Sequence, residues 1–358
     1  MWTFYVCAAL ATLTKGLIGI VIPVIIIGAW MLLLHNWRVL KQMYLPSGLA
    51  LFLMITAPWH LLVSVTNPEF ANFYFIQEHL LRFTIKPDHR YEPMWFYLPV
   101  LLVGWLPWVA FLGQALRFNL PSSWAARQEH SETLFLNLWA GLVFVFFSLA
   151  DSKLWPFILP MFPPVALLLG RYFAHAWGNN KLRGLRTGYW AVLGLGIALA
   201  AILSGGPRPG VGFAQAVEYD EVLGFYLYAG AAIAALGGII SFLLGMARFR
   251  LAFISLALSS VAFLTVLSQG LSLLDNKNST KALALQLKPL LGPDTEVMSY
   301  RHYYADLPVY LERRVTVVDY KGELEFGAEH EDVTGWMIDE DTFWQRWQGP
   351  STVYMLTR

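Results

Sequence analysis

A charged stretch between two apolar segments, QEHLLRFTIKPDHRYEP (77–93), holds residue types that could do chemistry. Its candidate side chains are Glu78, His79, Arg82, Lys86 and Arg90. Arginine and lysine bind phosphate oxygens through charge-assisted hydrogen bonds, and a histidine beside a carboxylate handles a metal ion or a proton. One interpretation is a site for a phosphorylated lipid. The alternative is a set of surface ion pairs worth under about 1 kcal/mol, with solvated histidines.

A second group, Asp151-Ser152-Lys153, lies directly between two apolar segments. Ionisable side chains at such a depth are costly unless they are matched, so they indicate either function or a buried ion pair. Lys15 follows the first apolar run, where the alternative is a lysine that extends its amine to the membrane surface. We treat Lys15, Asp151 and Lys153 as candidate binding residues.

The composition is that of a membrane protein. Of the 358 residues, 57% are hydrophobic and only 14% are charged, against about 25% charged in soluble domains. The net charge of +1 gives no footprint for nucleic acid, so we expect no nucleic-acid partner. Cys7 is the only cysteine, which excludes a disulfide framework and a thiolate metal cage.

Apolar runs long enough to approach a membrane span recur along the chain, since a span needs about 20 residues. We predict about nine, with the first and the proline-rich sixth being short. They are 2–14, 17–34, 47–66, 94–113, 133–150, 156–170, 188–204, 222–246 and 251–274. The prolines of the sixth segment (156, 160, 163 and 164) are expected to break its helix.

Basic residues in the connecting loops predict the orientation, because Lys and Arg resist translocation. One alternating set of loops holds ten of them and the other holds six. The set with six, which includes Lys15, Arg82 and Lys153, is then extracytoplasmic, together with everything after residue 275. In a bacterium this side is the periplasm.

Two regions outside the predicted spans have their own organisation. Residues 67–94 are expected to form an interfacial helix and loop, with Phe70, Phe73, Tyr74 and Phe75 in the headgroup layer. We therefore divide the chain into a transmembrane domain (1–274) and a small periplasmic α/β domain (275–358). In the latter we predict helices at 279–291 and 341–348, and strands at 295–299, 315–318 and 352–356.

Five stretches together resemble a known family. They are LATLTKG (10–16), APWHLLVSVTNPEF (57–70), FIQEHLLRF (75–83), HRYEPMWFYLPVLLVGWLPW (89–108) and DSKLWPFILPMFPPVALLLG (151–170). These stretches resemble the bacterial aminoarabinose transferases, polytopic GT-C glycosyltransferases related to protein O-mannosyltransferases. The tail YRHYYADLPVYLERRVTVVDYKGELEFG (300–327) is similar to the periplasmic domain of that family.

The resemblance implies transfer of a sugar from undecaprenyl phosphate to a periplasmic acceptor such as lipid A, a modification linked to polymyxin resistance. It further implies an inverting mechanism assisted by a divalent metal ion, in the inner membrane. His79 matches a histidine implicated in holding the metal. Arg82 and Lys15 match candidates for the carrier phosphate, with Asp151 and Lys153 lining the same cavity.

Two departures from the family pattern are visible. The family's catalytic carboxylates precede residue 1 of this chain, so no catalytic residue is assigned and we expect an N-terminally truncated member. Trp155-Pro156-Phe157 also stands where the family has a tyrosine, which removes a phenolic contact to the carrier phosphate.

Two other classes of protein stay open. A lipid-linked sugar transporter would place ionisable residues near the bilayer midplane and show internal repeats, whereas here the charges lie at span ends. A non-catalytic scaffold, whose periplasmic domain binds a partner, is the other alternative.

Overall fold

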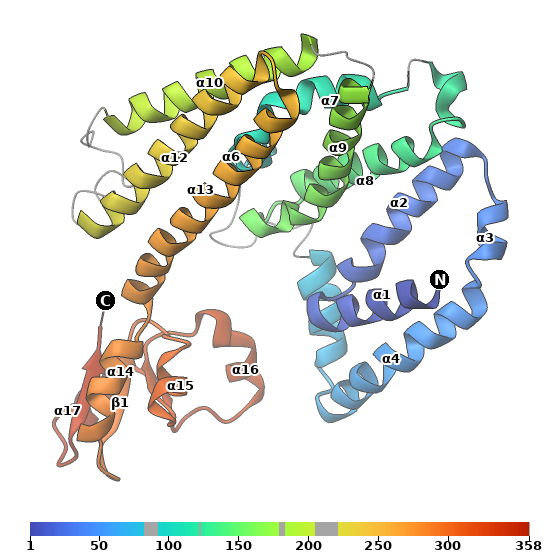
Figure 1. Cartoon of the computed structure of the whole chain (residues 1–358). Helices are drawn as coiled ribbons and strands as arrows, with labels where there is room; N and C mark the ends of the chain where they lie inside the picture. Colours follow the sequence, from blue (N-terminus) through green and yellow to red (C-terminus); the bar gives the residue numbers. More distant parts are fainter. Residues whose placement is uncertain (82–91, 122, 179–182, 205–220, 358) are drawn as a thin grey trace. The chain divides into compact units, whose positions relative to one another are not determined.

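The computed structural model describes residues 1–81, 92–121, 123–178, 183–204 and 221–357 (Figure 1). The chain divides into two compact units. Unit 1 comprises Met1–Gly205 and Ala231–Ala262, and unit 2 comprises Gly206–Gly230 and Phe263–Arg358. Unit 1 is helical, and unit 2 adds a small parallel sheet. The predicted fold class, a polytopic helical membrane protein with a small C-terminal α/β domain, is confirmed.

The described helices follow the predicted apolar runs closely. In the first half of the chain they are α1 (Trp2–Lys15), α2 (Ile18–Leu34), α3 (Arg38–Gln42), α4 (Leu45–Thr66), η1 (Asn72–Leu81), α6 (Tyr97–Gly104), η2 (Trp108–Phe111), α7 (Leu112–Asn119) and η3 (Trp124–Arg127). They continue with α8 (Ser131–Leu149), η4 (Trp155–Met161), α9 (Phe162–Gly178), α10 (Arg183–Ser204), α12 (Glu221–Gly245) and α13 (Phe249–Asn278).

Five helices within the described ranges are long and apolar enough to cross a membrane. They are Leu45–Thr66, Ser131–Leu149, Trp155–Gly178, Gly224–Gly245 and Phe249–Ser272. The helix Ile18–Leu34 is apolar but shorter. The multi-pass character predicted from composition follows from these helices.

The predicted single span 94–113 is wrong in shape. Tyr97–Gly104 and Trp108–Asn119 are separate helices that meet at an angle of 102°. Pro107 lies in the break, where a residue without an amide proton cannot continue the hydrogen-bond ladder of the first helix.

The sixth segment changes helix type among its prolines, from a 3₁₀ helix to the α-helix that begins at Phe162, but its predicted end is wrong. Helix runs from Trp155 to Gly178, well past the predicted end at residue 170. Pro156 and Pro160 lie in the 3₁₀ turns of η4, while Pro163 and Pro164 lie in the first turn of α9. The first turn of a helix tolerates proline because its amide protons have no intrahelical acceptor there.

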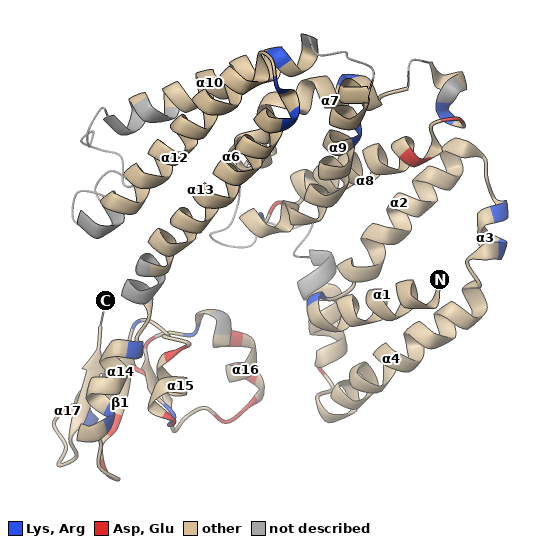
Figure 2. Cartoon of the chain, in the orientation of Figure 1, with Lys and Arg blue, Asp and Glu red and all other residues tan. Residues whose placement is uncertain are grey.

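Charged residues avoid the bodies of the helices in unit 1. Figure 2 shows these helices almost entirely uncharged, with Lys, Arg, Asp and Glu at helix ends and in connections. Arg171 is one exception, since it lies inside α9 and is 4.0 Å from Glu132 at the start of α8. This distribution keeps the charged groups near water and the helix bodies apolar.

Close packing in unit 1 depends on aromatic rings that fill recesses beside glycines. A Cβ placed on Gly48 of α4 would lie 2.1 Å from the ring of Tyr5, and one on Gly188 of α10 would lie 2.2 Å from the ring of Phe111. Phe111 is fully buried. Small residues of this kind let membrane helices approach each other closely.

Unit 2 contains a four-stranded sheet in which every neighbouring pair is parallel, in the order β3-β2-β1-β4. The strands are β1 (Glu296–Tyr300), β2 (Thr316–Val318), β3 (Met337–Ile338) and β4 (Val353–Leu356). The helices are α14 (Lys281–Leu287), η5 (Lys288–Leu290), α15 (Leu307–Leu311), η6 (Gly322–Leu324), α16 (Glu325–His330) and α17 (Glu340–Trp347).

Both faces of this sheet are covered. Val297 of β1 packs with Leu287 of α14 and Leu311 of α15, whereas Met298 packs with Phe343 of α17 on the other face. This alternation is what a strand buried on both sides requires. Helices and strands lie close to the predicted positions, although β3, α15 and α16 were not predicted.

Candidate functional site

Lys153 joins two segments that are distant in the sequence. Its side chain is 4% exposed. The Nζ atom donates to the backbone carbonyl of Glu92 at 2.8 Å and also to that of Ala150. The amide of Glu92 in turn donates to the carbonyl of Asp151 at 3.4 Å. The chain that enters α6 is therefore held against the turn that follows α8.

The electrostatics of Lys153 follow from its burial. Removal from water lowers the pKa of its amine, while the nearby carboxylates of Asp151 and Glu92 act in the opposite direction. The ammonium has three protons, and among the described residues the two carbonyls take two of them, which leaves one for a further acceptor. A single anionic oxygen would satisfy it.

Lys15 reaches the same end of unit 1 from a different helix. It is the last residue of α1, is exposed, and its Nζ lies 4.9 Å from the centre of the Phe157 ring. The buried Tyr97 donates its hydroxyl to the carbonyl of Leu154 at 3.1 Å. The ends of α1 and α8, the start of α6 and the turn 150–157 thus converge.

Phe157 lies in the stretch where the family was expected to have a tyrosine. Its ring faces the ammonium of Lys15, which is a cation–π contact rather than a hydroxyl contact. The neighbouring Trp155 is 71% exposed and so does not fill the same place.

The helix η1, which carries Glu78 and His79, packs on α4 through aromatic rings. The ring centre of Trp59 lies 5.5 Å from that of Phe70, and His60 lies 5.4 Å from Tyr74 and stacks on Phe75 at 6.0 Å. These aromatic residues were expected to lie in the headgroup layer. Phe70, Tyr74 and Phe75 contact α4 through ring pairs, and their place in the headgroup layer stays a prediction.

The helical prediction for this segment is confirmed over Asn72–Leu81, but the helix is a π-helix. Its hydrogen bonds join residues five apart rather than four. Such helices are rare and occur frequently at functional sites.

The predicted site residues divide into two groups. Lys15, Asp151 and Lys153 are described and lie at one end of unit 1. The side chains of Glu78 and His79 lie outside the described part of the chain, as do residues Arg82, Lys86 and Arg90 entirely. The roles assigned to all eight residues stay predictions.

The prediction of a bound divalent metal ion is not tested by the described residues. Within the described ranges no group of three or more His, Cys, Asp or Glu side chains could hold a metal ion. The metal stays a prediction that rests on His79, and no chemical step is derived through it here.

Three contributing residues were not found from the sequence. Glu92 lies at the end of the charged stretch but binds through its backbone, and Tyr97 stands in an apolar run like any core aromatic residue. His60 lies with its Nδ1 2.8 Å from the carbonyl oxygen of Thr56, which accepts the hydrogen bond. Its buried Nε2 has no hydrogen-bond partner among the described residues. No residue pattern signals these contacts, since they depend on packing.

Comparison with known proteins identifies relatives along most of the chain. Residues 283–357 match the family described as the aminoarabinose transferase C-terminal domain. The chain is 30% identical over 338 residues to the undecaprenyl phosphate-alpha-4-amino-4-deoxy-L-arabinose arabinosyl transferase of Pectobacterium carotovorum, covering 92% of this chain and 58% of the relative. The protein of the same name in Pectobacterium atrosepticum is 31% identical over 342 residues, with the same coverage.

Comparison with solved structures points to the same kind of protein as the sequence relatives. The structure of ArnT from Cupriavidus metallidurans bound to undecaprenyl phosphate matches with a TM-score of 0.79 at 27% identity, covering 98% of this chain and 63% of that chain. The apo form of the same protein matches with a TM-score of 0.78. The chain spans about three fifths of the length of the curated relatives it matches. These sequence and structural likenesses confirm the resemblance to the aminoarabinose transferases along most of this chain, and residues 283–357 match the C-terminal domain of that family.

Proposed function

We propose that this chain acts in the transfer of a sugar from undecaprenyl phosphate to an acceptor at the outer face of the bacterial inner membrane, with lipid A as the acceptor. The convergence of Lys15 and Lys153 on one end of the helical unit is the structural observation that supports this proposal most directly. The names of the relatives and the ligand of the matched structure point to the same class of donor.

The proposed reaction is a single displacement at the sugar's anomeric carbon. An acceptor oxygen forms a bond to that carbon while the bond from the carbon to the carrier phosphate oxygen breaks. The electron pair leaves with undecaprenyl phosphate, and the configuration is inverted. Negative charge therefore grows on the carrier phosphate during the step.

Positive side chains at that phosphate lower the barrier because they interact most strongly with the leaving group as its charge develops. Lys15 is exposed at the end of α1 and is the described residue best placed to meet a headgroup phosphate. Lys153 is buried and fixes the segment that follows Arg82, Lys86 and Arg90 in the sequence. Its role is therefore to position that segment and to add positive potential.

The proposal includes a location. The apolar helices make the protein multi-pass, and we place the end of unit 1 that carries Lys15 and Asp151, together with unit 2, on the periplasmic side. The excess of basic residues in the opposite loops supports this orientation.

Binding of the carrier provides the first test. The chain in lipid nanodiscs should bind undecaprenyl phosphate in native mass spectrometry and should bind undecaprenol, which lacks the phosphate, far more weakly. Lys15→Gln should weaken binding of the phosphate about tenfold, as expected for one charge-assisted contact. Lys41→Gln is the matched control, since Lys41 is an exposed lysine at the end of α3.

Transfer itself is tested with a lipid-linked aminoarabinose donor and lipid A, using mass spectrometry of the product. In cells, His79→Ala or Arg82→Ala should abolish lipid A modification and polymyxin resistance. Full modification in both variants would remove these residues from the site. Equal binding of undecaprenol and undecaprenyl phosphate would contradict the proposal that this chain recognises the phosphate of the carrier.

A further inference from the structure

Four helices of unit 1 meet where the chain turns from α12 into α13. The hydroxyl of Tyr189 in α10 donates to the carbonyl of Phe249, the first residue of α13, at 3.5 Å. A Cβ on Gly245, the last residue of α12, would lie 2.6 Å from the ring of Tyr189. The ring centre of Trp177 in α9 lies 5.2 Å from that of Phe253, one turn into α13. The turn between α12 and α13 is therefore packed firmly against α9 and α10.

Three arginines surround this junction. The guanidinium of Arg186 in α10 lies 5.8 Å from the centre of the Phe249 ring, which is a cation–π contact. Arg248 and Arg250 flank Phe249 in the sequence. All three arginine side chains are exposed, and none has a carboxylate partner in the part of the chain that the structure describes. Figure 2 shows basic segments of α10 and of the start of α13 at this junction.

The position of two of these arginines increases the need for an anion. The N-terminus of a helix carries a partial positive charge, so acidic side chains are favourable in its first turn and basic ones are unfavourable. The first turn of α13 contains Arg250 and no acidic residue, and Arg248 directly precedes it. Three guanidiniums and a helix dipole of the same sign thus act together. A bound anion would offset all of them.

The residues that follow the arginines suit an amphiphilic ligand. Arg250, Ile254 and Leu258 are spaced four residues apart, so they lie along one face of α13. Ile254 is 50% exposed and Leu258 is 66% exposed. This face therefore presents one positive charge at the helix start and an apolar surface below it. A soluble anion would use only the charge, whereas a lipid would cover both parts.

The junction lies at the other end of a span from the proposed carrier site. The helix Trp155–Gly178 connects the two places, because Phe157 near its start faces Lys15 and Trp177 near its end contacts Phe253. Its 24 residues extend roughly 35 Å at about 1.5 Å per residue, enough to cross the hydrocarbon core. An anion at the arginines is therefore a different molecule from a carrier phosphate near Lys15.

We propose that Arg186, Arg248 and Arg250 bind the phosphate of an anionic phospholipid, whose acyl chains lie along Ile254 and Leu258. The lipid belongs to the leaflet opposite the proposed carrier phosphate, and it neutralises the positive charge where α10 meets α12 and α13. Phosphatidylglycerol fits this site because its headgroup carries one negative charge and no amine. Phosphatidylethanolamine fits poorly, since its ammonium would face three guanidiniums.

Native mass spectrometry of the full chain in detergent tests the site, with defined lipids added back. Phosphatidylglycerol should bind at least about tenfold more tightly than phosphatidylethanolamine with the same acyl chains. Arg186→Gln and Arg248→Gln should each weaken the binding of phosphatidylglycerol about fivefold, as expected for one basic residue at an anionic headgroup. Glutamine keeps a long polar side chain at each position, and circular dichroism checks that the helical content is unchanged.

The matched control is Arg38→Gln, because Arg38 is an exposed arginine at the start of α3 on the same predicted side of the membrane. It removes the same charge and should leave the binding of phosphatidylglycerol unchanged. Inorganic phosphate should not displace the lipid, since it has no acyl chains. The proposal is overturned if phosphatidylethanolamine binds equally well, if Arg38→Gln weakens binding as much as Arg186→Gln does, or if inorganic phosphate displaces the lipid.

This site does not rest on the proposed function, and the two can be tested apart. Lys15→Gln should leave the binding of phosphatidylglycerol unchanged, and Arg186→Gln should leave the binding of undecaprenyl phosphate unchanged. A loss of both ligands in Arg186→Gln would contradict two separate lipid sites. A loss of undecaprenyl phosphate alone in Lys15→Gln would support them.

Discussion

The ammonium of Lys153 donates a hydrogen bond of 2.8 Å to the backbone carbonyl of Glu92, 61 residues earlier in the chain. A buried charge thereby joins the turn after α8 to the entrance of α6. The two carbonyls that it binds belong to Glu92 and Ala150, which both lie outside the described helices and strands. Lys153 is thus a structural requirement of the same region that we propose binds the carrier.

Replacement of Lys153 by methionine should destabilise the helical unit. The side chain keeps its length, but the carbonyls of Glu92 and Ala150 lose their donor. The expected loss is about 1–3 kcal/mol, the cost of leaving buried polar groups unpaired. Thermal unfolding in one detergent measures it, with Lys41→Met as the exposed control; equal melting temperatures for the two variants would contradict this role.

Two glycines of α10 should respond in opposite directions to alanine. Gly188→Ala places a methyl group 2.2 Å from the ring of Phe111 and should cost about 1–3 kcal/mol through overpacking. Gly194→Ala meets nothing within 4 Å and should stabilise the helix by up to about 1 kcal/mol. The difference in melting temperature between the variants is the measurement, and a Gly188→Ala variant as stable as Gly194→Ala would refute the packing argument.

Asp306 should stabilise unit 2 in a pH-dependent way. Partial burial alone would raise the pKa of this carboxyl, but the hydrogen bonds from Thr280 and Ser279 outweigh it and lower the pKa. The stabilisation is then complete above the ordinary pKa of aspartate and is lost as the pH falls through the lowered value. Asp306→Ala should cost about 1 kcal/mol at neutral pH and less in acid. Denaturation followed by Trp fluorescence at several pH values tests this, with exposed Asp294→Ala as the control.

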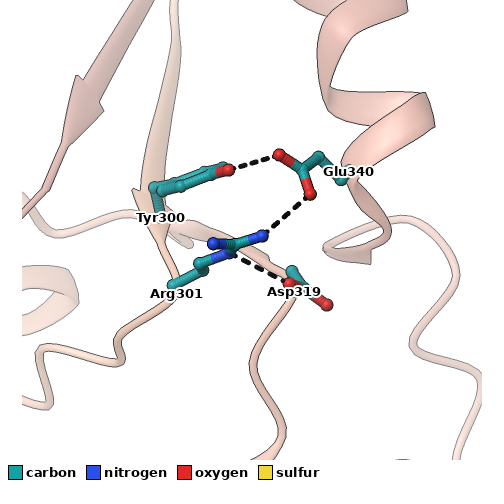
Figure 3. A network of polar contacts seen from close by, with 4 residues as sticks. All are labelled: Tyr300, Arg301, Asp319 and Glu340. Carbon is teal, nitrogen blue, oxygen red and sulfur yellow. Dashed lines mark hydrogen bonds and ion pairs between the residues drawn. The ribbon is translucent and has the colours of Figure 1, made fainter.

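The pKa of the Tyr300 phenol should lie above its ordinary value. The hydrogen bond from its hydroxyl to Glu340 (Figure 3) is the main cause that raises the pKa of the phenol above the ordinary value of 10.0. The folded chain holds this proton more tightly than the unfolded chain, so the linked stability is present below pH 10.0 and is lost as the pH rises through the raised pKa. Glu340→Gln should lower the pKa of Tyr300, as measured by NMR of ¹³C-labelled tyrosine with Tyr300→Phe for assignment. An unchanged titration would show that the two side chains do not interact in solution.

The proposed orientation makes a topological prediction. Cys7 is the only cysteine, so Cys7→Ala provides a background for single-cysteine labelling. Cysteines placed at Glu78 and Asp151 should both react with a membrane-impermeant maleimide added to the periplasmic side, whereas one at Lys41 should not. Labelling of Glu78→Cys and Asp151→Cys from opposite sides would exclude a shared pocket.

Much of the fold could be predicted from the sequence because its signals are local. The helix at α17 and the strands β1, β2 and β4 follow from periodicity and β-branched residues. The strand β3 has only Met337 and Ile338, too few residues to show any pattern. The full length of α9 was missed because Arg171 and His175 interrupt the apolar run, although a helix accommodates both near its end.

The candidate site was predictable only in part, since its contacts depend on the path of the chain. Residue types pointed to Lys15, Asp151 and Lys153 as ionisable groups next to apolar segments. The partner of Lys153 is a backbone carbonyl, which every residue has, so no pattern marks Glu92. The bend between Gly104 and Trp108 could not be predicted either, because a hydropathy pattern shows where apolar residues lie and not the angle between two helices.

The amino ends of β1 and β4 in unit 2 are preceded by exposed turns. The turns at Pro293–Asp294 and Gly349–Ser351 lie beyond the amino ends of β1 and β4 and are exposed. An epitope tag inserted there would leave the strands and helices of unit 2 uninterrupted. An antibody fragment bound to such a tag would give a small membrane protein a rigid marker for electron cryomicroscopy.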